Sequence, residues 1–137
     1  MDSISINYLS LLVAGIAAMV LGSIWYGPLF GKKWMHLSGM TQASMEEAKK
    51  GGMAKLYFWA FVGALVMAYV LAHFVEYFGA DTAGRALQLA FWAWLGFIAT
   101  SSLGSVLWEN KSKELYLINN SYQLVSLAVM ALIIALW

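Results

Sequence analysis

Two polar stripes near the C-terminal end are the residues most suited to chemistry. Each repeats amide, hydroxyl or carboxyl side chains at intervals of three or four residues, which would place them on one face of a helix. The stripes flank a short loop, so antiparallel helices would bring them together. With their polar neighbours they form one candidate polar cavity of Ser101, Ser102, Ser105, Glu109, Asn119, Asn120, Gln123 and Ser126.

Such groups can serve two purposes where the surroundings are apolar. They can tie helices together through hydrogen bonds worth roughly 0.6 kcal/mol each. They can instead line a wet cavity that opens to the cytoplasm and binds a small polar solute, because polar groups inside a membrane mark sites by default. The density of polar groups on the last helix exceeds what ties alone require, and both interpretations stay open.

A second candidate is the pair His73 and Glu76, which lies one helical turn beyond Tyr69. The two side chains could share a proton or contact a ligand, or they could be polar residues at the end of a helix. A catalytic zinc site needs three protein ligands, and the other histidine, His36, is expected on the opposite side of the membrane. We therefore predict no metal site.

Motifs of known enzymes do not occur in this sequence. It has no cysteine and no Gly-rich phosphate loop, G-x-S-x-G elbow or H-E-x-x-H pair. We predict no enzymatic activity and no cofactor. A net charge of +1 without a basic cluster argues against nucleic acid as a partner.

The composition indicates the environment in which these residues are held. Of 137 residues, 62% are hydrophobic and 11% are charged, whereas soluble domains have about 45–50% and about 25%. A chain with so few polar groups cannot cover a water-exposed surface. The composition predicts an integral membrane protein surrounded by membrane lipids.

Four apolar segments match the roughly 20 residues that a helix needs to cross a bilayer. We predict one all-α transmembrane domain, residues 1–137, in which four antiparallel helices span residues 8–26, 54–78, 85–107 and 115–137. Loop 27–53 is expected to contain a short surface helix within MTQASMEEAKKGG, ended by Gly51 and Gly52; the alternative is a flexible loop.

The distribution of basic residues predicts the orientation. Loop 27–53, the start of the second helix and the loop before the fourth helix contain seven of the eight basic residues, and only Arg85 lies on the other side. Loops rich in lysine and arginine stay in the cytoplasm. We therefore place the protein in the cell inner (cytoplasmic) membrane with both termini outside.

The segment WYGPLFGKKWMHLSG, residues 25–39, follows the first apolar run directly. Its aromatic rings and lysines suit the headgroup region, and its proline is expected to end the helix. We interpret the segment as the point where the chain leaves the membrane; the alternative is a lid or binding loop. The interface anchors are Trp25, Tyr26, Pro28, Lys32, Lys33 and Trp34.

These fifteen residues, placed after a first membrane helix, resemble the start of a family of small bacterial membrane proteins. The family is catalogued as a domain of unknown function, number seventeen-sixty-one. The likeness extends to the length, the four helices and the terminal Trp137. It implies a membrane and a fold class, and it implies no functional residue.

Small residues at four-residue spacing predict where helices pack, since close backbone approach drives association in lipid. We expect three such seams: Ala14, Ala18 and Gly22; Ala60, Ala64, Ala68 and Ala72; and Gly96, Thr100 and Gly104. The similarity of IAAMVLGSI (residues 16–24) to IATSSLGSV (residues 98–106) suggests a two-helix parallel repeat, with chance similarity as the alternative.

The leading functional hypothesis is a non-enzymatic homo-oligomer or a subunit that binds another membrane protein, because four short helices leave few inward faces. The second is a transporter or channel subunit for a small polar solute or a proton, built on the polar stripes. A third is a membrane enzyme that uses His73 and Glu76.

Overall fold

The computed structural model describes residues 5–137, and this part of the chain consists of helices and turns without any strand. Four helical stretches are long and apolar enough to cross a membrane: Tyr8–Leu29, Met53–Tyr77, Ala83–Leu107 and Lys113–Leu136. The predicted all-α fold with four spans is confirmed. The elements are α1 (Tyr8–Ile24), η1 (Trp25–Leu29), α2 (Gly31–Ser38), α3 (Gln42–Lys50), α4 (Met53–Tyr77), α5 (Ala83–Ala93), η2 (Trp94–Ala99), α6 (Thr100–Ser102), α7 (Gly104–Leu107) and α8 (Lys113–Leu136).

Side-chain caps mark where three of the spans begin. The side chains of Asn7, Thr82 and Ser112 accept hydrogen bonds from backbone N–H groups in the first turns of α1, α5 and α8. These N–H groups have no partner inside the helix, so a short oxygen-bearing side chain stabilises the helix start. Each cap precedes an apolar run in the sequence.

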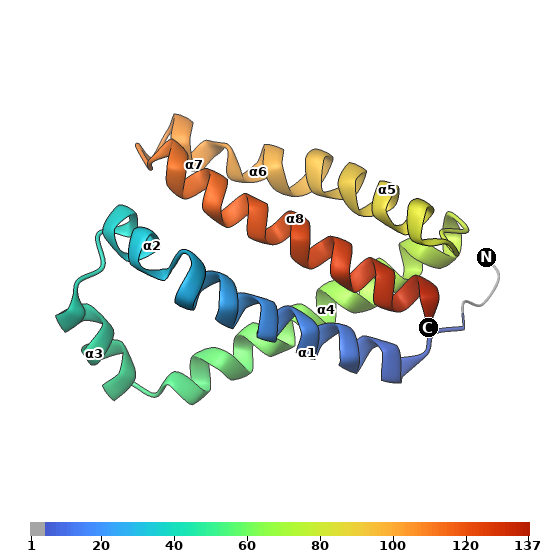
Figure 1. Cartoon of the computed structure of the whole chain (residues 1–137), viewed down its shortest axis with the longest axis horizontal. Coiled ribbons are helices and arrows are strands. Elements are labelled where there is room, and N and C mark those ends of the chain that lie inside the picture. Colours follow the sequence, from blue (N-terminus) through green and yellow to red (C-terminus); the bar gives the residue numbers. More distant parts are fainter. Residues whose placement is uncertain (1–4) are drawn as a thin grey trace.

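Helix α8 lies at the centre of the bundle, where it packs against α1, α4 and α5 (Figure 1). Successive spans run in opposite directions across the figure. The core is made largely of alanines, which let the backbones approach closely. The most buried core side chains are Ala14, Ala18, Ala68, Leu71, Ala72, Ala86, Ala90, Leu127, Met130 and Ala131.

Helices α1 and α4 approach each other closely at Gly15 on α1. A Cβ atom there would lie 2.9 Å from Cδ2 of Leu65 on α4. The predicted seams on the first and second spans contribute to this packing, since Ala14, Ala18 and Ala68 are buried. The packing of these two spans therefore depends on small residues, as the sequence predicts.

The predicted seam on the third span does not form a contact within the chain. Gly96 and Thr100 are exposed, and the buried small residues of this span are Ala86, Ala90 and Ala99. The reason is the π-helical segment η2. A π-helical turn contains an extra residue, so it shifts which of the following positions lie on the buried face.

The same irregularity bears on the suggested repeat. Residues 16–24 form the second half of the regular helix α1, whereas residues 98–106 cross η2, α6 and α7. The two segments therefore differ in backbone structure. The repeat stays a prediction.

Pro28 does not end the first helix, which corrects the sequence interpretation. It lies inside η1, and the helix continues to Leu29. The backbone N–H of Phe30 donates to the carbonyl of Trp25, five residues back, at 2.8 Å. Proline is tolerated here because the widened turn removes the clash between its ring and the carbonyl four residues earlier.

The chain then turns sharply into α2 at Gly31. A Cβ atom at this buried glycine would lie 2.6 Å from the backbone oxygen of Tyr26, so no other residue fits without a shift. Helix α2 ends at Gly39, which has a left-handed φ of 75°. The first loop therefore contains a helix, α2, that the sequence analysis did not anticipate.

Helix α3 covers the segment for which the sequence predicts a short surface helix. The Thr41 side chain caps it by accepting from the N–H of Ser44, and Lys49 and Lys50 occupy its last turn. Cations at this end interact favourably with the helix dipole. Most residues of α3 are exposed, as expected of a surface helix.

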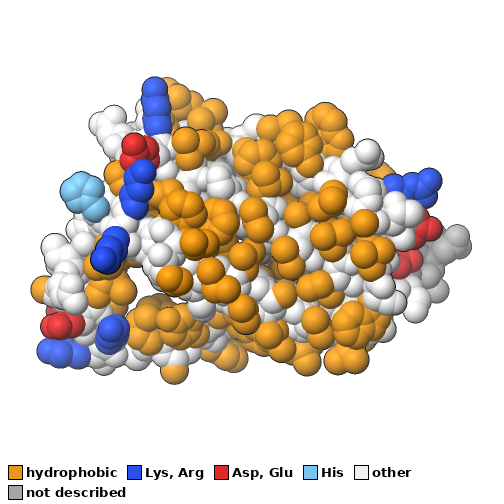
Figure 2. Space-filling model, viewed as in Figure 1, with side chains coloured by type: hydrophobic (Ala, Val, Ile, Leu, Met, Phe, Trp, Pro, Cys, Tyr) orange, Lys and Arg blue, Asp and Glu red, His pale blue; other side chains and the backbone are white. Residues whose placement is uncertain are grey.

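Charged side chains gather at the two ends of the molecule, and the face between them that Figure 2 shows is largely apolar. One end is formed by α2, α3 and the beginnings of α4 and α8. We call it the lysine-rich end, since these elements and the residues beside them contain Lys32, Lys33, Lys49, Lys50, Lys55, Lys111 and Lys113. Arg85 lies at the start of α5, at the opposite end, where it pairs with Asp81.

Candidate functional site

The first half of α8 contains the polar residues that contact the neighbouring spans. Asn120 is buried and its polar groups are all engaged. Its Oδ1 accepts from the hydroxyl of Ser102 at 2.7 Å, and its Nδ2 donates to the carbonyl of Tyr116 at 2.9 Å. Its backbone carbonyl accepts from Nε1 of Trp94 at 2.8 Å. Asn120 is therefore a structural tie between α8 and the third span.

Asn119 faces the first span, where its Oδ1 accepts from the hydroxyl of Tyr26 at 2.8 Å. This bond leaves its amide N–H groups available as donors. Gln123, one turn further on, makes no hydrogen bond with the described residues and is partly exposed. The two side chains thus provide amide donors that the fold does not use.

The hydroxyl groups of the third span mostly serve its own backbone. Ser101 donates to the carbonyl of Phe97 and Thr100 donates to that of Gly96, while the Ser102 hydroxyl has the carbonyl of Ile98 at 2.7 Å as an alternative acceptor to Asn120. All three acceptors lie in η2, where the wide turn weakens the regular helical bonding. Serine and threonine satisfy such carbonyls in membrane helices.

Five of the eight predicted cavity residues do come together. A hollow of about 270 Å³ is lined by Ser101, Ser102, Asn119, Asn120 and Gln123, together with Met67 and Ile98. It lies between α8, the third span and α4. These five residues therefore share one hollow with an apolar wall, and a cavity that binds a polar solute stays a prediction.

The other three predicted residues do not reach the hollow. Ser105 donates to the carbonyl of Ser102, and Glu109 is exposed in the loop before α8. Ser126 is buried elsewhere on α8. Helical spacing misplaces Ser105 and Glu109 because the third span is broken after Ser102 and the chain is no longer helical at Glu109. Ser126 lies on the regular helix α8, beyond the part that lines the hollow.

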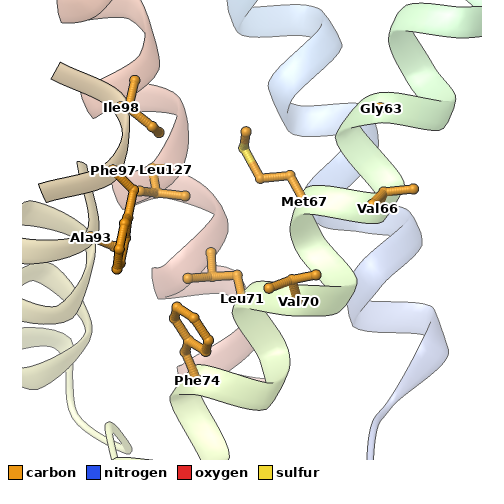
Figure 3. A pocket seen from close by; sticks show the side chains of 10 residues that line it. All are labelled: Gly63, Val66, Met67, Val70, Leu71, Phe74, Ala93, Phe97, Ile98 and Leu127. Carbon is orange, nitrogen blue, oxygen red and sulfur yellow. The ribbon is translucent and has the colours of Figure 1, made fainter. Parts of the chain in front are cut away.

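An apolar groove adjoins the hollow, with a volume of about 390 Å³. Figure 3 shows side chains of α4 on one side and of the third span on the other, with Leu127 of α8 between them. The groove exists because α4 and α5 make few contacts with each other and both pack on α8. Its lining residues are Gly63, Val66, Met67, Val70, Leu71, Phe74, Ala93, Phe97, Ile98 and Leu127.

His73 and Glu76 are not joined in the structure. Nδ1 of His73 lies 2.8 Å from the carbonyl of Tyr69, and the two rings stack edge to face at 4.7 Å. Glu76 is exposed and borders a polar recess formed with the two chain ends, near Asn7 and Trp137. The pair thus shares a helix face without the contact that proton sharing would need.

The side chains of the predicted interface anchors Trp25 and Tyr26 contact α8, whereas the sequence suggests that they face the lipid headgroups. Nε1 of Trp25 donates to the carbonyl of Ile118 on α8 at 3.1 Å. The ring of Tyr26 stacks on Trp34 and Tyr122, at 5.8 Å and 5.3 Å. These aromatic rings hold η1 and α2 against α8, because a half-buried indole or phenol needs a partner for its polar atom.

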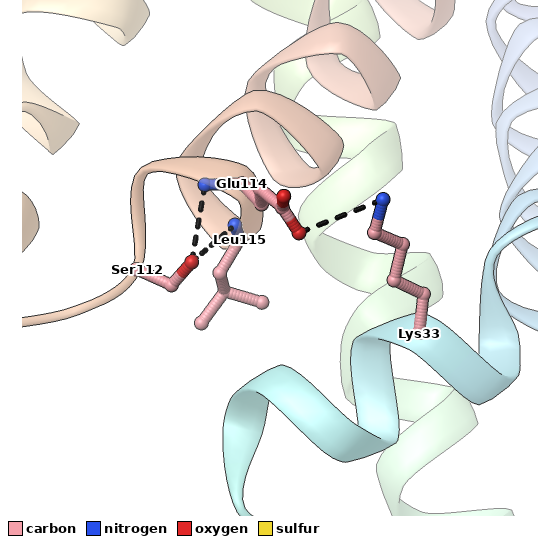
Figure 4. Close-up of polar contacts among 4 residues, drawn as sticks. All are labelled: Lys33, Ser112, Glu114 and Leu115. Atoms are coloured by element: carbon pink, nitrogen blue, oxygen red, sulfur yellow. Dashed lines mark hydrogen bonds and ion pairs between the residues drawn. The ribbon is translucent and has the colours of Figure 1, made fainter.

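Lys32 and Lys33 are exposed on α2. Nζ of Lys33 forms an ion pair with Glu114 in the first turn of α8, at 3.5 Å (Figure 4). Ser112 caps the same turn. The pair links the first loop to the start of α8 and is largely exposed, so it contributes little to stability.

The sequence analysis missed three donors that hold α8 in place. They are Trp94, Tyr116, whose hydroxyl donates to the carbonyl of Ala99 at 2.7 Å, and Tyr122, whose hydroxyl donates to the carbonyl of Ala18 at 3.1 Å. Their residue types could have indicated this role, since the O–H and N–H groups of tyrosine and tryptophan buried in a membrane need hydrogen-bond acceptors. Which carbonyls accept could not be read from spacing.

Comparison with known proteins gives one match. A family model described as Protein of unknown function (DUF1761) matches residues 9–135. Neither the curated proteins nor the solved structures contain a match.

Proposed function

The chain belongs to the DUF1761 family, whose description assigns no activity, and we propose that it is a non-enzymatic multi-pass subunit of the inner membrane. In this proposal it assembles with further copies of itself or with another membrane protein. Its lysine-rich end faces the cytoplasm and its termini face outward. The asymmetry of basic residues supports this orientation.

The observation that carries the proposal is the outer face of the third span. Only 11% of the residues in its most apolar window are buried, compared with 33% in α8. Gly96 and Thr100 are exposed on this span, and the space around a Cβ atom at Gly96 is open. Small residues on a lipid-facing surface allow the backbone of a second helix to approach closely.

Crosslinking in native membranes tests this assembly. The chain has no cysteine, so Thr100→Cys introduces a single thiol on the outer face. If two copies assemble, we expect oxidation to give a disulfide-linked dimer. If the partner is another protein, we expect a bifunctional thiol-reactive reagent to give an adduct with it. Adding Gly96→Leu should reduce the yield, because a larger side chain keeps the helices apart.

Gly63→Leu is the matched control. Gly63 is an exposed glycine on α4 with open space around it, so its replacement should leave the yield unchanged. A chain that stays monomeric at all expression levels and forms no adduct would contradict the proposal. So would equal effects of the two leucine variants.

A second candidate function is transport of a small polar solute or a proton. The observation that favours it is the polar hollow, where Asn119 and Gln123 offer unused amide groups. Gln123→Leu removes one of these groups without breaking a hydrogen bond to the described residues. Loss of solute or proton flux in proteoliposomes, with the fold and oligomer intact, would favour transport over assembly.

A further inference from the structure

The hollow and the apolar groove lie side by side, since Met67 and Ile98 line both, and together we call them the recess. The recess runs between α4 and the third span, with α8 as its floor (Figure 3). One part is polar and contains Asn119 and Gln123. The other part is lined by hydrocarbon and aromatic side chains such as Phe74. A ligand that fills it must be polar at one end and apolar along its length.

The lining also specifies the kind of polar group. None of the residues that line either part carries an ionisable side chain. The groups left free are the amide N–H donors of Asn119 and the whole amide of Gln123. Such donors suit a neutral acceptor such as an ester carbonyl, whereas a charged group would be desolvated without a counter-ion.

Depth along α8 matches a lipid of the leaflet at the lysine-rich end. At 1.5 Å per residue, Asn119 and Gln123 lie about 9 Å and about 15 Å from Lys113, and Leu127 lies about 21 Å away. The interfacial layer between headgroups and hydrocarbon is roughly 5–8 Å thick on each side. The Asn119 backbone therefore lies just below the ester level, and that of Gln123 lies one turn deeper. Side chains on a helix lean toward its N-terminus, so the Gln123 amide is directed back toward the ester level, whereas Leu127 lies in the hydrocarbon core.

The size of the groove suits a narrower occupant than a whole helix. A helix about 10 Å wide occupies about 420 Å³ per turn of 5.4 Å, so a groove of about 390 Å³ holds less than one turn. The same volume falls in the range of small-molecule sites, about 300–1,000 Å³. A single hydrocarbon chain is narrow enough to lie along it.

We infer that this recess binds one acyl chain of a glycerolipid from the leaflet at the lysine-rich end. The chain lies in the apolar groove, and its ester carbonyl accepts from the amides of Asn119 and Gln123. This inference concerns the side of the third span that faces α4, whereas the proposed assembly uses Gly96 and Thr100 on its exposed face. The two can fail independently.

Photocrosslinking tests occupancy of the groove. The protein is reconstituted in phosphatidylcholine vesicles that contain a trace of phosphatidylcholine with a diazirine at the middle of one acyl chain. We expect labelling of peptides containing Met67 and Ile98 that saturates and is competed by unlabelled lipid. Gly63→Leu should reduce this labelling about tenfold, because the added side chain enters the groove and burial of a few methylene groups is lost.

Gly96→Leu is the matched control, since it adds the same atoms to the third span at a residue that does not line the recess. It should leave labelling unchanged. Labelling that never saturates, or that falls equally in both variants, would overturn the inference.

A comparison of ester and ether lipids tests the amide contact. Ether lipids have the same chains and lack the carbonyl acceptor. Native mass spectrometry of the wild-type protein, loaded with equal amounts of the two, should show about threefold more ester lipid retained, the ratio expected for one average membrane hydrogen bond. In Gln123→Leu the ratio should fall while total retention persists, because only the Asn119 donors remain. Equal retention by the wild type would overturn the carbonyl contact.

Discussion

The hydroxyl of Tyr26 donates a hydrogen bond to Oδ1 of Asn119 at 2.8 Å, and so joins the end of the first span to the beginning of the fourth. The residues are 93 positions apart in the chain. The same ring packs edge-on against Tyr122 and Trp34. This contact orients Asn119, whose free amide groups belong to the polar hollow.

Replacing Tyr26 with phenylalanine should destabilise the protein by roughly 0.6 kcal/mol and at most about 1.7 kcal/mol, the range for hydrogen bonds between membrane helices. Unfolding in mixed micelles with increasing SDS measures the change. Tyr8→Phe is the control, because Tyr8 is 70% exposed. In Asn119→Leu the further effect of Tyr26→Phe should vanish, and a persisting effect would show that the ring packing is responsible.

Gly31→Ala should lower stability by roughly 1–3 kcal/mol, the cost of forcing an atom into a packed site. The added Cβ would lie 2.6 Å from the backbone oxygen of Tyr26, which cannot rotate away. Gly27→Ala is a close control on the other side of Pro28, since no atom lies within 4 Å of a Cβ placed there. The same SDS titration compares them, and equal midpoints would rule out the tight turn.

Trp94→Phe should destabilise the bundle by roughly 1–3 kcal/mol, because it removes a hydrogen bond to the carbonyl of Asn120 as well as part of a half-buried ring. Trp92→Phe makes the same chemical change two residues earlier, where the side chain is 65% exposed. Its effect should be close to zero. If both variants unfold alike, η2 is not held to α8 through this indole.

The proposed orientation predicts which introduced cysteines a membrane-impermeant maleimide reaches in intact cells. Asp81→Cys, at the end opposite the lysines, should react from outside. Lys49→Cys and Lys111→Cys should react only after the membrane is opened, because loops rich in lysine stay in the cytoplasm. Reaction of Lys111→Cys in sealed cells would reverse the orientation, and reaction of all three would contradict a four-span fold.

The four spans could be predicted because lipid imposes a simple requirement on length and apolar content. The interruptions within them could not. Pro28 predicts a helix end by its chemistry, yet a π-helical turn accommodates it. A second such turn, η2, shifts the phase of the third span and turns Gly96 outward. Neither turn leaves a periodic signal in the sequence.

The sequence predicts the positions of the polar residues on α8 better than those of the polar residues on the third span. Asn119, Asn120 and Gln123 lie on a regular helix, so their spacing places them correctly. Ser105 and Glu109 follow the break in the third span, where helical spacing no longer applies. The backbone carbonyls of η2 also occupy the hydroxyls of this span, and sequence patterns do not reveal that competition.

The central position of α8 has a consequence for synthesis. The third span packs mainly on α8, and α8 follows it in the chain. While the ribosome is still synthesising α8, the third span is already in the bilayer but lacks the helix against which it mainly packs. Insertion and folding are therefore separate events in time for this span, and the fold closes only when α8 leaves the translocon.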